Sequence, residues 1–323
     1  MRRTKQLLSV LLALTLLLCA LPMGMSAIAY SSGDFEYDIL ADGTVIITGY
    51  SGTAATLVIP AKIAGQPVTR IGGTAFNYCS FLTSVTIPDS VTRIGDCAFQ
   101  GCASLTSVTI PGSVTYIGEG TFWSCAFYDC ASLTDIFVSD GSATYTDIDG
   151  VLFNKDKTTL IQYPAGKSPA NYTIPDSVTR IRTDAFYNCL SLTGITIPGS
   201  VTRIGSGAFS NRPALTGITI PDSVTSIGRC VFDNCTSLTD IFVSDGNSNY
   251  VDIDGVLFSK DQTTLIQYPA GKSPANYTIP DSVTEIEGNA FYACESLTDI
   301  FVSDGNAHYA DIDGVLFDKD QPP

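Results

Sequence analysis

Apolar and polar positions repeat along most of the chain with a short period. The nine-residue segment that begins at Ile87, IPDSVTRIG, returns almost unchanged further along, and shorter forms of it hold the same register elsewhere. The ten anchors, separated by 28, 23, 28, 36, 23, 23, 23, 36 and 23 residues, are Ile59, Ile87, Ile110, Val138, Ile174, Ile197, Ile220, Val243, Ile279 and Val302. A unit this short cannot bury a core alone and must stack on its neighbours, so the pattern predicts a solenoid.

Each repeat predicts two short strands and a turn. In one copy, the alternation of apolar and polar residues over Leu105–Ile110 indicates a strand. This strand ends at Pro111, because proline lacks the N–H group that a strand ladder needs. Val91–Ile94 forms a second inward-facing segment, and Cys97–Cys102 is expected to make a single helical turn that buries Phe99. The predicted fold class is therefore mostly β with short helical turns.

Two of the repeats are 36 residues long and contain an insertion. Asp147–Phe153, a turn at Lys155–Lys157 and the segment Thr158–Tyr163 predict a β-hairpin that projects from the solenoid. Residues 256–283 repeat residues 151–178 with only two changes. This unit was therefore duplicated as a block.

The first 29 residues predict an export signal. Three basic residues among the first five precede an apolar run over Leu7–Leu18, and Ala27–Ala29 supplies a small-x-small cleavage site. The apolar run is shorter than a membrane span requires. Cleavage near Ala29 is therefore expected to release a mature chain without a membrane span, secreted from the cell or held at its surface.

The repeat L-x-x-V-x-I-P-x-S-V-T-x-I-G-x-x-A-F-x-x-C resembles that of the BspA-like bacterial leucine-rich repeat surface proteins. Seven phenylalanine-centred turns carry the likeness, at Phe76, Phe99, Phe122 or Phe127, Phe186, Phe209, Phe232 and Phe291. The resemblance implies an N-terminal β cap over residues 30–58, with a hairpin turn at Ala41–Gly43, and a leucine-rich-repeat solenoid over residues 59–323. Because solenoids normally end in a cap, the last repeat, which stops at Pro323, is expected to be truncated.

The net charge of the chain narrows the classes of binding partner that we expect. The chain has 17 basic and 32 acidic side chains, a formal net charge of −15. Loss of the three signal-peptide cations lowers this to −18. Nucleic acids and anionic membranes require a positive binding surface, so neither is an expected partner.

Cysteines recur three residues after the turn phenylalanines and form one predicted column, at Cys79, Cys102, Cys130, Cys189, Cys235 and Cys294. A small buried thiol in each repeat is the favoured interpretation. Disulfides stay open as an alternative because export permits them, although the nine cysteines left after signal cleavage cannot all pair within a monomer. No C-x-x-C pair occurs, which argues against zinc. We expect no metal and no cofactor.

Three Asp-x-Asp-Gly elements, Asp147–Gly150, Asp252–Gly255 and Asp311–Gly314, suggest candidate chemistry. A calcium loop needs an oxygen ligand at its first position, and the residue there is a tyrosine in all three. Paired aspartates also serve glycosidases, but three equal copies without nearby glutamates favour a turn that feeds the hairpin. The only histidine, His308, aligns with unrelated residues in its sister copies. We therefore expect a protein that is not an enzyme.

The expected ligand-binding surface is the outward register of the first strands, taken to line the concave face. Six repeats place threonine there, at Thr86, Thr109, Thr173, Thr196, Thr219 and Thr278. Three others place an aromatic ring there, each two residues after an acid: Phe137 with Asp135, Phe242 with Asp240, and Phe301 with Asp299. Exposed aromatic rings on a solenoid face mark contact points. The alternative is that each ring packs beneath the adjacent hairpin.

Together these features predict an exported, non-enzymatic repeat protein that binds an extracellular protein or glycan. The family resemblance implies cell-surface adhesion or host-matrix binding. A structural spacer that presents a further C-terminal domain is the first alternative. An extracellular hydrolase is a more distant one.

Overall fold

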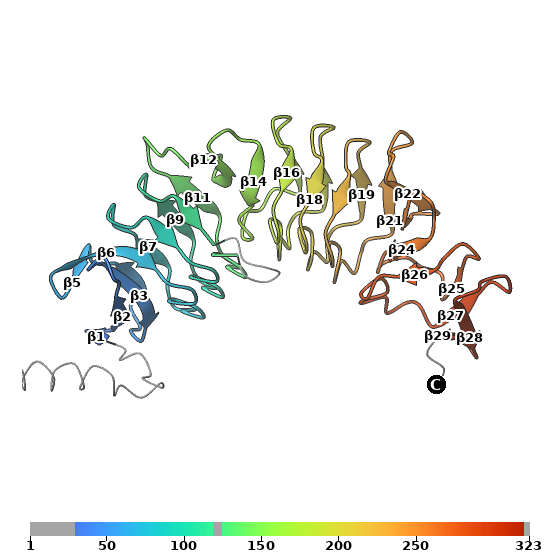
Figure 1. Cartoon of the computed structure of the whole chain (residues 1–323), viewed down its shortest axis with the longest axis horizontal. Coiled ribbons are helices and arrows are strands. Elements are labelled where there is room, and N and C mark those ends of the chain that lie inside the picture. The colour runs from blue at the N-terminus through green and yellow to red at the C-terminus, as the bar shows by residue number, and fades with distance from the viewer. Residues whose placement is uncertain (1–29, 119–124, 320–323) are drawn as a thin grey trace, which may run out of the picture.

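The computed structural model describes residues 30–118 and 125–319. Within these ranges the chain forms an all-β solenoid bent into an arc, and no residue is helical (Figure 1). The predicted solenoid is thus confirmed. The predicted signal peptide lies outside the described residues. In the part that is described, no helix is long and apolar enough to cross a membrane.

The first strand of each repeat stacks in parallel on the first strand of the next. One sheet contains β4 (Thr56–Val58), β7 (Ser84–Thr86), β9 (Ser107–Ile110) and β11 (Asp135–Val138). The later first strands pair as β15 (Asn171–Thr173) with β17 (Gly194–Thr196), β19 (Gly217–Ile220) with β21 (Asp240–Val243), and β25 (Asn276–Ile279) with β27 (Asp299–Val302). Alternate residues are buried, as the sequence pattern predicts, because successive side chains of a strand point to opposite faces.

The second strands stack in the same way. They form three groups: β6 (Gln66–Ile71), β8 (Arg93–Ile94) and β10 (Tyr116–Ile117); then β14 (Thr159–Gln162), β16 (Arg180–Ile181), β18 (Arg203–Ile204) and β20 (Ser226–Ile227); then β24 (Thr264–Gln267) and β26 (Glu285–Ile286). A two-residue strand, β5 (Lys62–Ile63), pairs with β6. Within the first group the isoleucines of successive strands, Ile71, Ile94 and Ile117, are in register and buried.

Three antiparallel strands precede the repeats: β1 (Tyr30–Ser32), β2 (Phe35–Ile39) and β3 (Val45–Tyr50). Strand β3 pairs in parallel with β6, so these strands extend the second-strand sheet at the N-terminal end. Val45 and Ile47 are fully buried, and the ring of Tyr50 lies 5.6 Å from that of Phe76. The antiparallel strands therefore shield the core of the first repeat from solvent.

The turn after each second strand is not the predicted helical turn. In most repeats the residues two before and two after the phenylalanine have left-handed backbone, as in Cys97 (φ 54°) and Gly101 (φ 67°) around Phe99. Left-handed residues cannot continue a right-handed α-helix. The turn is instead a series of i→i+3 hydrogen bonds, such as that from Gln100 N to Cys97 O at 3.0 Å. Phe99 is fully buried, as predicted.

The buried rings stack along the solenoid axis in three runs. The first run is Tyr50, Phe76, Phe99 and Phe127, with centroid distances of 5.6, 5.1 and 5.6 Å. The second is Tyr163, Phe186, Phe209 and Phe232, with distances of 5.2, 5.4 and 5.8 Å, and the third is Tyr268 and Phe291 at 5.7 Å. In the hairpin repeats a tyrosine takes the phenylalanine's place.

The cysteine column is structural, as predicted. The thiol of Cys102 donates to the Phe76 carbonyl at 3.1 Å, and that of Cys235 donates to the Phe209 carbonyl at the same distance. Burial raises the pKa of Cys102 to about 12, so this thiol stays protonated at neutral pH. In one repeat Arg212 takes the column position, where it is fully buried and donates to the Leu192 carbonyl. No disulfide links the column cysteines in the described part of the chain.

Each insertion adds two strands that pair with each other: β12 (Tyr145–Ile148) with β13 (Val151–Asn154), β22 (Tyr250–Ile253) with β23 (Val256–Ser259), and β28 (Tyr309–Ile312) with β29 (Val315–Asp318). The predicted hairpin, with its turn at Lys155–Lys157, is the pairing of the second of these strands with the strand that follows it, and it is present in the first two copies. Asp149 and Gly150 at the first turn have φ values of 49° and 74°, which a type I′ hairpin turn requires. Strand β13 also pairs with β14, the second strand of its own repeat. The hairpin does not stand free of the body, because Val151, Leu152 and Phe153 are fully buried.

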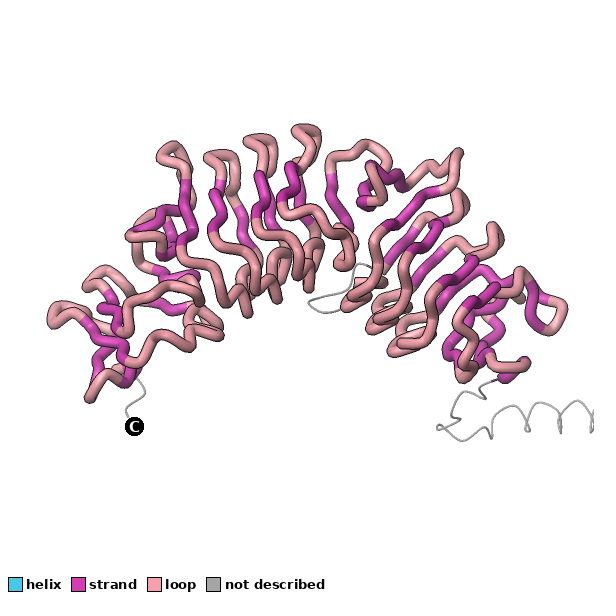
Figure 2. The backbone as a smooth tube through the Cα atoms, turned by 180° about the vertical axis from the view of Figure 1, so that it is seen from behind, coloured by secondary structure: helices cyan, strands magenta, loops and turns pink. Residues whose placement is uncertain are grey.

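The hairpins interrupt the second-strand sheet at two places. We call the gap between β10 and β14 the first junction, and the gap between β20 and β24 the second junction. At the first junction the turns on either side of the hairpin repeat meet directly, since Asn188 Nδ2 donates to Asp129 Oδ1 at 2.8 Å across 59 residues. Fewer repeats are therefore stacked on the side of the solenoid that carries these turns than on the opposite side. The arc therefore bends toward the turns, which form its inner rim (Figure 2).

Candidate ligand-binding surfaces

The structure places the predicted aromatic residues in the outward column. Phe137 pairs with Thr109, Phe242 with Thr219, and Phe301 with Thr278. Their side chains are 46%, 51% and 40% exposed. The hairpins therefore leave much of each ring accessible, against the alternative in which each ring packs beneath its hairpin.

The column does not line the concave face, and this expectation was wrong. The strands cross the body of the arc from the inner to the outer rim (Figures 1 and 2). Side chains that point outward from such strands lie on a flank of the arc. The first strands are also divided among four separate sheets. The three phenylalanines therefore form three separate patches along one flank and not one continuous site.

Each of these phenylalanines lies on a first strand, and the hairpin of the same repeat covers the edge of that strand. Ile136 N donates to Gly150 O at 2.9 Å, and Val138 N donates to Asp147 Oδ1 at 2.8 Å. The other two copies repeat the second bond, from Val243 N to Asp252 and from Val302 N to Asp311. The first aspartate of each Asp-x-Asp-Gly element thus satisfies an edge N–H group. It belongs to the turn that feeds the hairpin, as favoured from the sequence.

Two lysines that the sequence reasoning missed complete the first two patches. Lys167 Nζ lies 3.0 Å from Asp135 Oδ1, and Lys272 Nζ lies 3.4 Å from Asp240 Oδ1. Partial burial, which raises the pKa of Asp135, is outweighed by hydrogen bonds from Lys167 and Thr134, so that this pKa is lowered. We call the sets Asp135–Phe137–Lys167 and Asp240–Phe242–Lys272, together with the pair Asp299–Phe301, the flank patches. Recurrence of the lysine in the duplicated block was the available sequence signal.

The first junction is closed by a buried arginine. Arg182, only 3% exposed, donates through one terminal nitrogen to the carbonyl oxygens of Gly118 and Ile117, the latter at 3.4 Å. On the rim side, the ring of Tyr128 stacks on that of Tyr187 at 4.1 Å. A cavity of only about 10 Å³ lies between the described residues of this junction.

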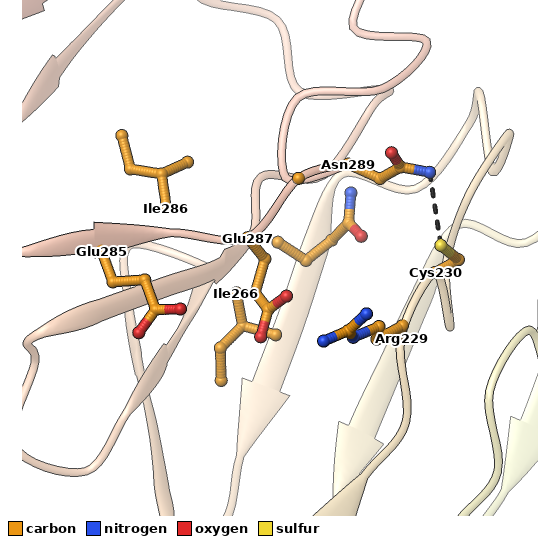
Figure 3. Close-up of a pocket in the computed structure, with 9 residues that line it drawn as sticks. Arg229, Cys230, Ile266, Glu285, Ile286, Glu287 and Asn289 are labelled. Atoms are coloured by element: carbon orange, nitrogen blue, oxygen red, sulfur yellow. Dashed lines mark hydrogen bonds between the residues drawn. The ribbon is translucent and has the colours of Figure 1, made fainter. Parts of the chain in front are cut away.

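The second junction is open. Its main cavity, the junction pocket, has a volume of about 420 Å³, and its lining includes Arg229, Cys230, Ile266, Glu285, Glu287 and Asn289 (Figure 3). Arg229 and Glu287 point toward one another across it. Asn289 Nδ2 donates to Cys230 Sγ at 3.3 Å and to Asp233 Oδ2 at 2.6 Å. Burial raises the pKa of the Cys230 thiol to about 11, so the thiol is protonated at neutral pH and is a poor nucleophile.

A second cavity, the rim pocket, lies next to the junction pocket and shares Asn289 with it. It has a volume of about 220 Å³, and its lining includes Tyr187, Asn211, Asp233, Asn234 and Tyr292. The sequence reasoning missed both pockets. The available sequence signal was that the two copies of the duplicated region differ at a few positions. Residues 105 positions apart differ where the junction closes, as Arg182 against Glu287, Tyr128 against Asp233, and Asn188 against Ala293.

Comparison with known proteins supports the family resemblance. A family model described as "BspA type Leucine rich repeat region" matches in six copies over residues 59–166, 165–273 and 270–317. Over 85% of this chain and 76% of the other, the structure is similar to a leucine rich cell surface protein from Faecalibacterium prausnitzii, with 32% identity and a TM-score of 0.51. No curated protein was found to match the chain.

Two further solved structures share the fold at lower identity. A leucine-rich repeat protein from Eubacterium ventriosum is 24% identical, with a TM-score of 0.52 over 85% of this chain and 84% of the other. The pneumococcal vaccine antigen PcpA is 16% identical, with a TM-score of 0.51 over 88% and 90% of the two chains. These similarities concern the arrangement of the strands and not a ligand.

Proposed function

Because this chain belongs to the BspA-type leucine-rich repeat family, and one similar solved protein is described as a cell surface protein, we propose that it is exported and acts outside the cell as a non-enzymatic binding protein. Its role is attachment to an extracellular macromolecule such as a matrix protein. The predicted signal peptide and the acidic net charge agree with an extracellular location.

The flank patches are the observation that carries this proposal. Each presents an aromatic ring that is 40–51% exposed beside a carboxylate at a fixed place on the flank. An aromatic ring offers a large apolar contact area, and such rings are enriched at protein interfaces. Patches repeated along a rigid arc allow several weak contacts to one extended ligand, which raises the overall affinity.

The test replaces all three rings in one variant, Phe137→Ser/Phe242→Ser/Phe301→Ser. Each ring buries roughly half its surface on binding, worth about 1 kcal/mol, so the variant should bind immobilised matrix proteins at least tenfold more weakly than the wild type. A matched control, Thr109→Ser/Thr219→Ser/Thr278→Ser, changes the neighbouring positions of the same column and should bind normally. Surface plasmon resonance measures the affinities, and circular dichroism checks the fold.

Undiminished binding by the phenylalanine variant would show that the flank patches are not the contact surface. Export is tested separately by N-terminal sequencing of the protein recovered from the culture medium or the cell surface. We expect a mature chain that begins at or near Tyr30. An intact N-terminus in the cytoplasmic fraction would contradict the proposed export.

A further inference from the structure

We infer that the rim pocket at the second junction binds a neutral sugar residue of a glycan. The inference concerns the inner rim, whereas the proposed attachment function rests on the flank patches. It rests on an unsatisfied buried carboxylate oxygen, on an amide ladder that ends at the pocket and on an uncovered tyrosine ring.

The unsatisfied group is Asp233. Its side chain is 7% exposed, its Oδ2 accepts the hydrogen bond from Asn289, and the Cys230 thiol also interacts with the carboxyl group. Its Oδ1 is buried and has no partner among the described residues. A buried acceptor left without a donor is costly, so Asp233 Oδ1 favours a ligand that supplies an O–H or N–H group. Burial raises the pKa of this carboxyl, which weakens its preference for a cation over a hydroxyl.

The amide ladder runs along the inner rim and stops at the rim pocket. Asn188 Nδ2 donates to Asp129 Oδ1, Asn211 Nδ2 to Asn188 Oδ1, and Asn234 Nδ2 to Asn211 Oδ1. The next position of the column is Ala293, which has no amide. Asn234 Oδ1 therefore receives no donor within the described part of the chain, and it gives the pocket a second acceptor. Each ladder amide also keeps one N–H that the ladder does not use.

The apolar wall of the rim pocket is Tyr292. At the first junction the equivalent ring, Tyr187, is covered by Tyr128 at 4.1 Å. At the second junction Asp233 stands where Tyr128 would be, so Tyr292 is 54% exposed. An exposed aromatic face beside amide and carboxylate acceptors matches a pyranose ring, which has an apolar C–H face and a rim of hydroxyl groups. The volume of about 220 Å³ is below the roughly 300–1,000 Å³ of drug-sized sites and suits a single sugar ring.

The duplicated block supplies the experiment. Asp233→Tyr/Ala293→Asn restores at the second junction the two rim residues of the first, Tyr128 and Asn188, and should close the rim pocket. The wild-type protein is screened on an array of neutral oligosaccharides that end in glucose, galactose, mannose or N-acetylglucosamine, and hits are quantified by calorimetry. We expect the wild type to bind at least one terminal sugar and the closed variant to lose at least tenfold in affinity. Tyr292→Ala should lose a similar amount.

Three comparisons keep the inference falsifiable. Asn234→Ala removes one acceptor with little change in packing and should weaken sugar binding severalfold, which protects the test if the closed variant misfolds. Tyr78→Ala removes another exposed turn tyrosine outside the pocket and should bind normally. The triple flank-patch variant should also keep sugar binding, which separates this inference from the proposed attachment function.

Absence of binding to any neutral sugar would overturn the inference. Equal binding by the wild type, the closed variant and Tyr292→Ala would also overturn it. A third contrary outcome is competition by spermidine at concentrations that leave the flank patches unaffected, because it would assign the pocket to cationic amines.

Discussion

The two junctions contain the same hairpin contact, but the first is closed and the second is open. At each junction a tyrosine of the hairpin accepts a hydrogen bond from the exposed edge of the preceding second strand, from Ile117 N to Tyr145 Oη at 3.0 Å and from Ile227 N to Tyr250 Oη at 2.9 Å. The first junction is then sealed by Arg182 and by the Tyr128–Tyr187 stack, whereas the second leaves cavities of about 420 and 220 Å³. The duplicated hairpin is common to both. The state of each junction is therefore set by a few side chains in the flanking turns.

The clearest of these differences is that the first junction has a basic residue where the second has an acidic one. Where the first junction has Arg182, the second has Glu287, which cannot donate to strand carbonyls. The opposing position of the second junction holds Arg229, which points at Glu287 across open space (Figure 3). Arg182 closes the sheet edge, because it donates to two strand carbonyls and leaves no gap. Arg229 is exposed and Glu287 is half-buried, and the space between them leaves room for a ligand.

Exchanging the charged residues should reveal the largest difference in stability between the two junctions. Arg182→Glu places a buried carboxylate against the carbonyls of Ile117 and Gly118, and should lower the free energy of unfolding by about 3–5 kcal/mol. The matched change, Glu287→Arg, lies in an open pocket and should alter it by less than about 1 kcal/mol. Urea denaturation followed by circular dichroism measures both. Equal effects of the two variants would mean that the junctions do not differ in the way described.

The tyrosine stack should give a smaller difference. Tyr128→Leu removes a ring that is buried against Tyr187, and should cost about 1–2 kcal/mol through the lost stacking and packing. Tyr292→Leu replaces a half-exposed ring and should cost no more than about 0.5 kcal/mol. The same denaturation experiment compares them. A larger loss for Tyr292→Leu would indicate that the ring is covered in solution.

The pH dependence of the free energy of unfolding gives a further test of the second junction. Burial raises the pKa of Asp233 above its ordinary value of 3.8, so the folded protein holds a proton that the unfolded chain releases. The stability that this proton contributes is fully present below pH 3.8 and is lost as the pH rises through the folded pKa. Replacing the carboxylate with a neutral amide in Asp233→Asn should therefore increase the stability at pH 7 relative to the wild type, with the difference vanishing in acid.

Asp135 provides the control of opposite sign. Its pKa is lowered in the folded protein, so its stabilising contribution is present above pH 3.8 and is lost as the pH falls through the folded pKa. Asp135→Asn should thus destabilise the protein at pH 7 and converge with the wild type in acid. Thermal melts between pH 3 and pH 7 measure both series. Parallel curves for the two variants would refute the assigned directions.

Much of the fold was predictable because each repeat contains its own local signals. Alternation around Ile110, the proline that follows most first strands, and the Asp149–Gly150 turn each act over a few residues. The helical turn was mispredicted because left-handed residues such as Cys97 are not glycines and carry no obvious sequence mark. The concave assignment of Phe137 was wrong because the direction of curvature depends on how whole repeats stack.

Sequence periodicity alone predicts the stacked repeats, the line of buried rings, the cysteine column and the outward register of the phenylalanines. These follow from short-range periodicity and from residues that recur at one position of every repeat. Which junction is closed and which is open depends instead on the packing between repeats that are far apart in the sequence. The physical reason is distance along the chain, because Arg182 reaches Ile117 across 65 residues and Asn289 reaches Asp233 across 56. Such contacts depend on how two repeats pack on either side of a hairpin, and no single repeat contains that information.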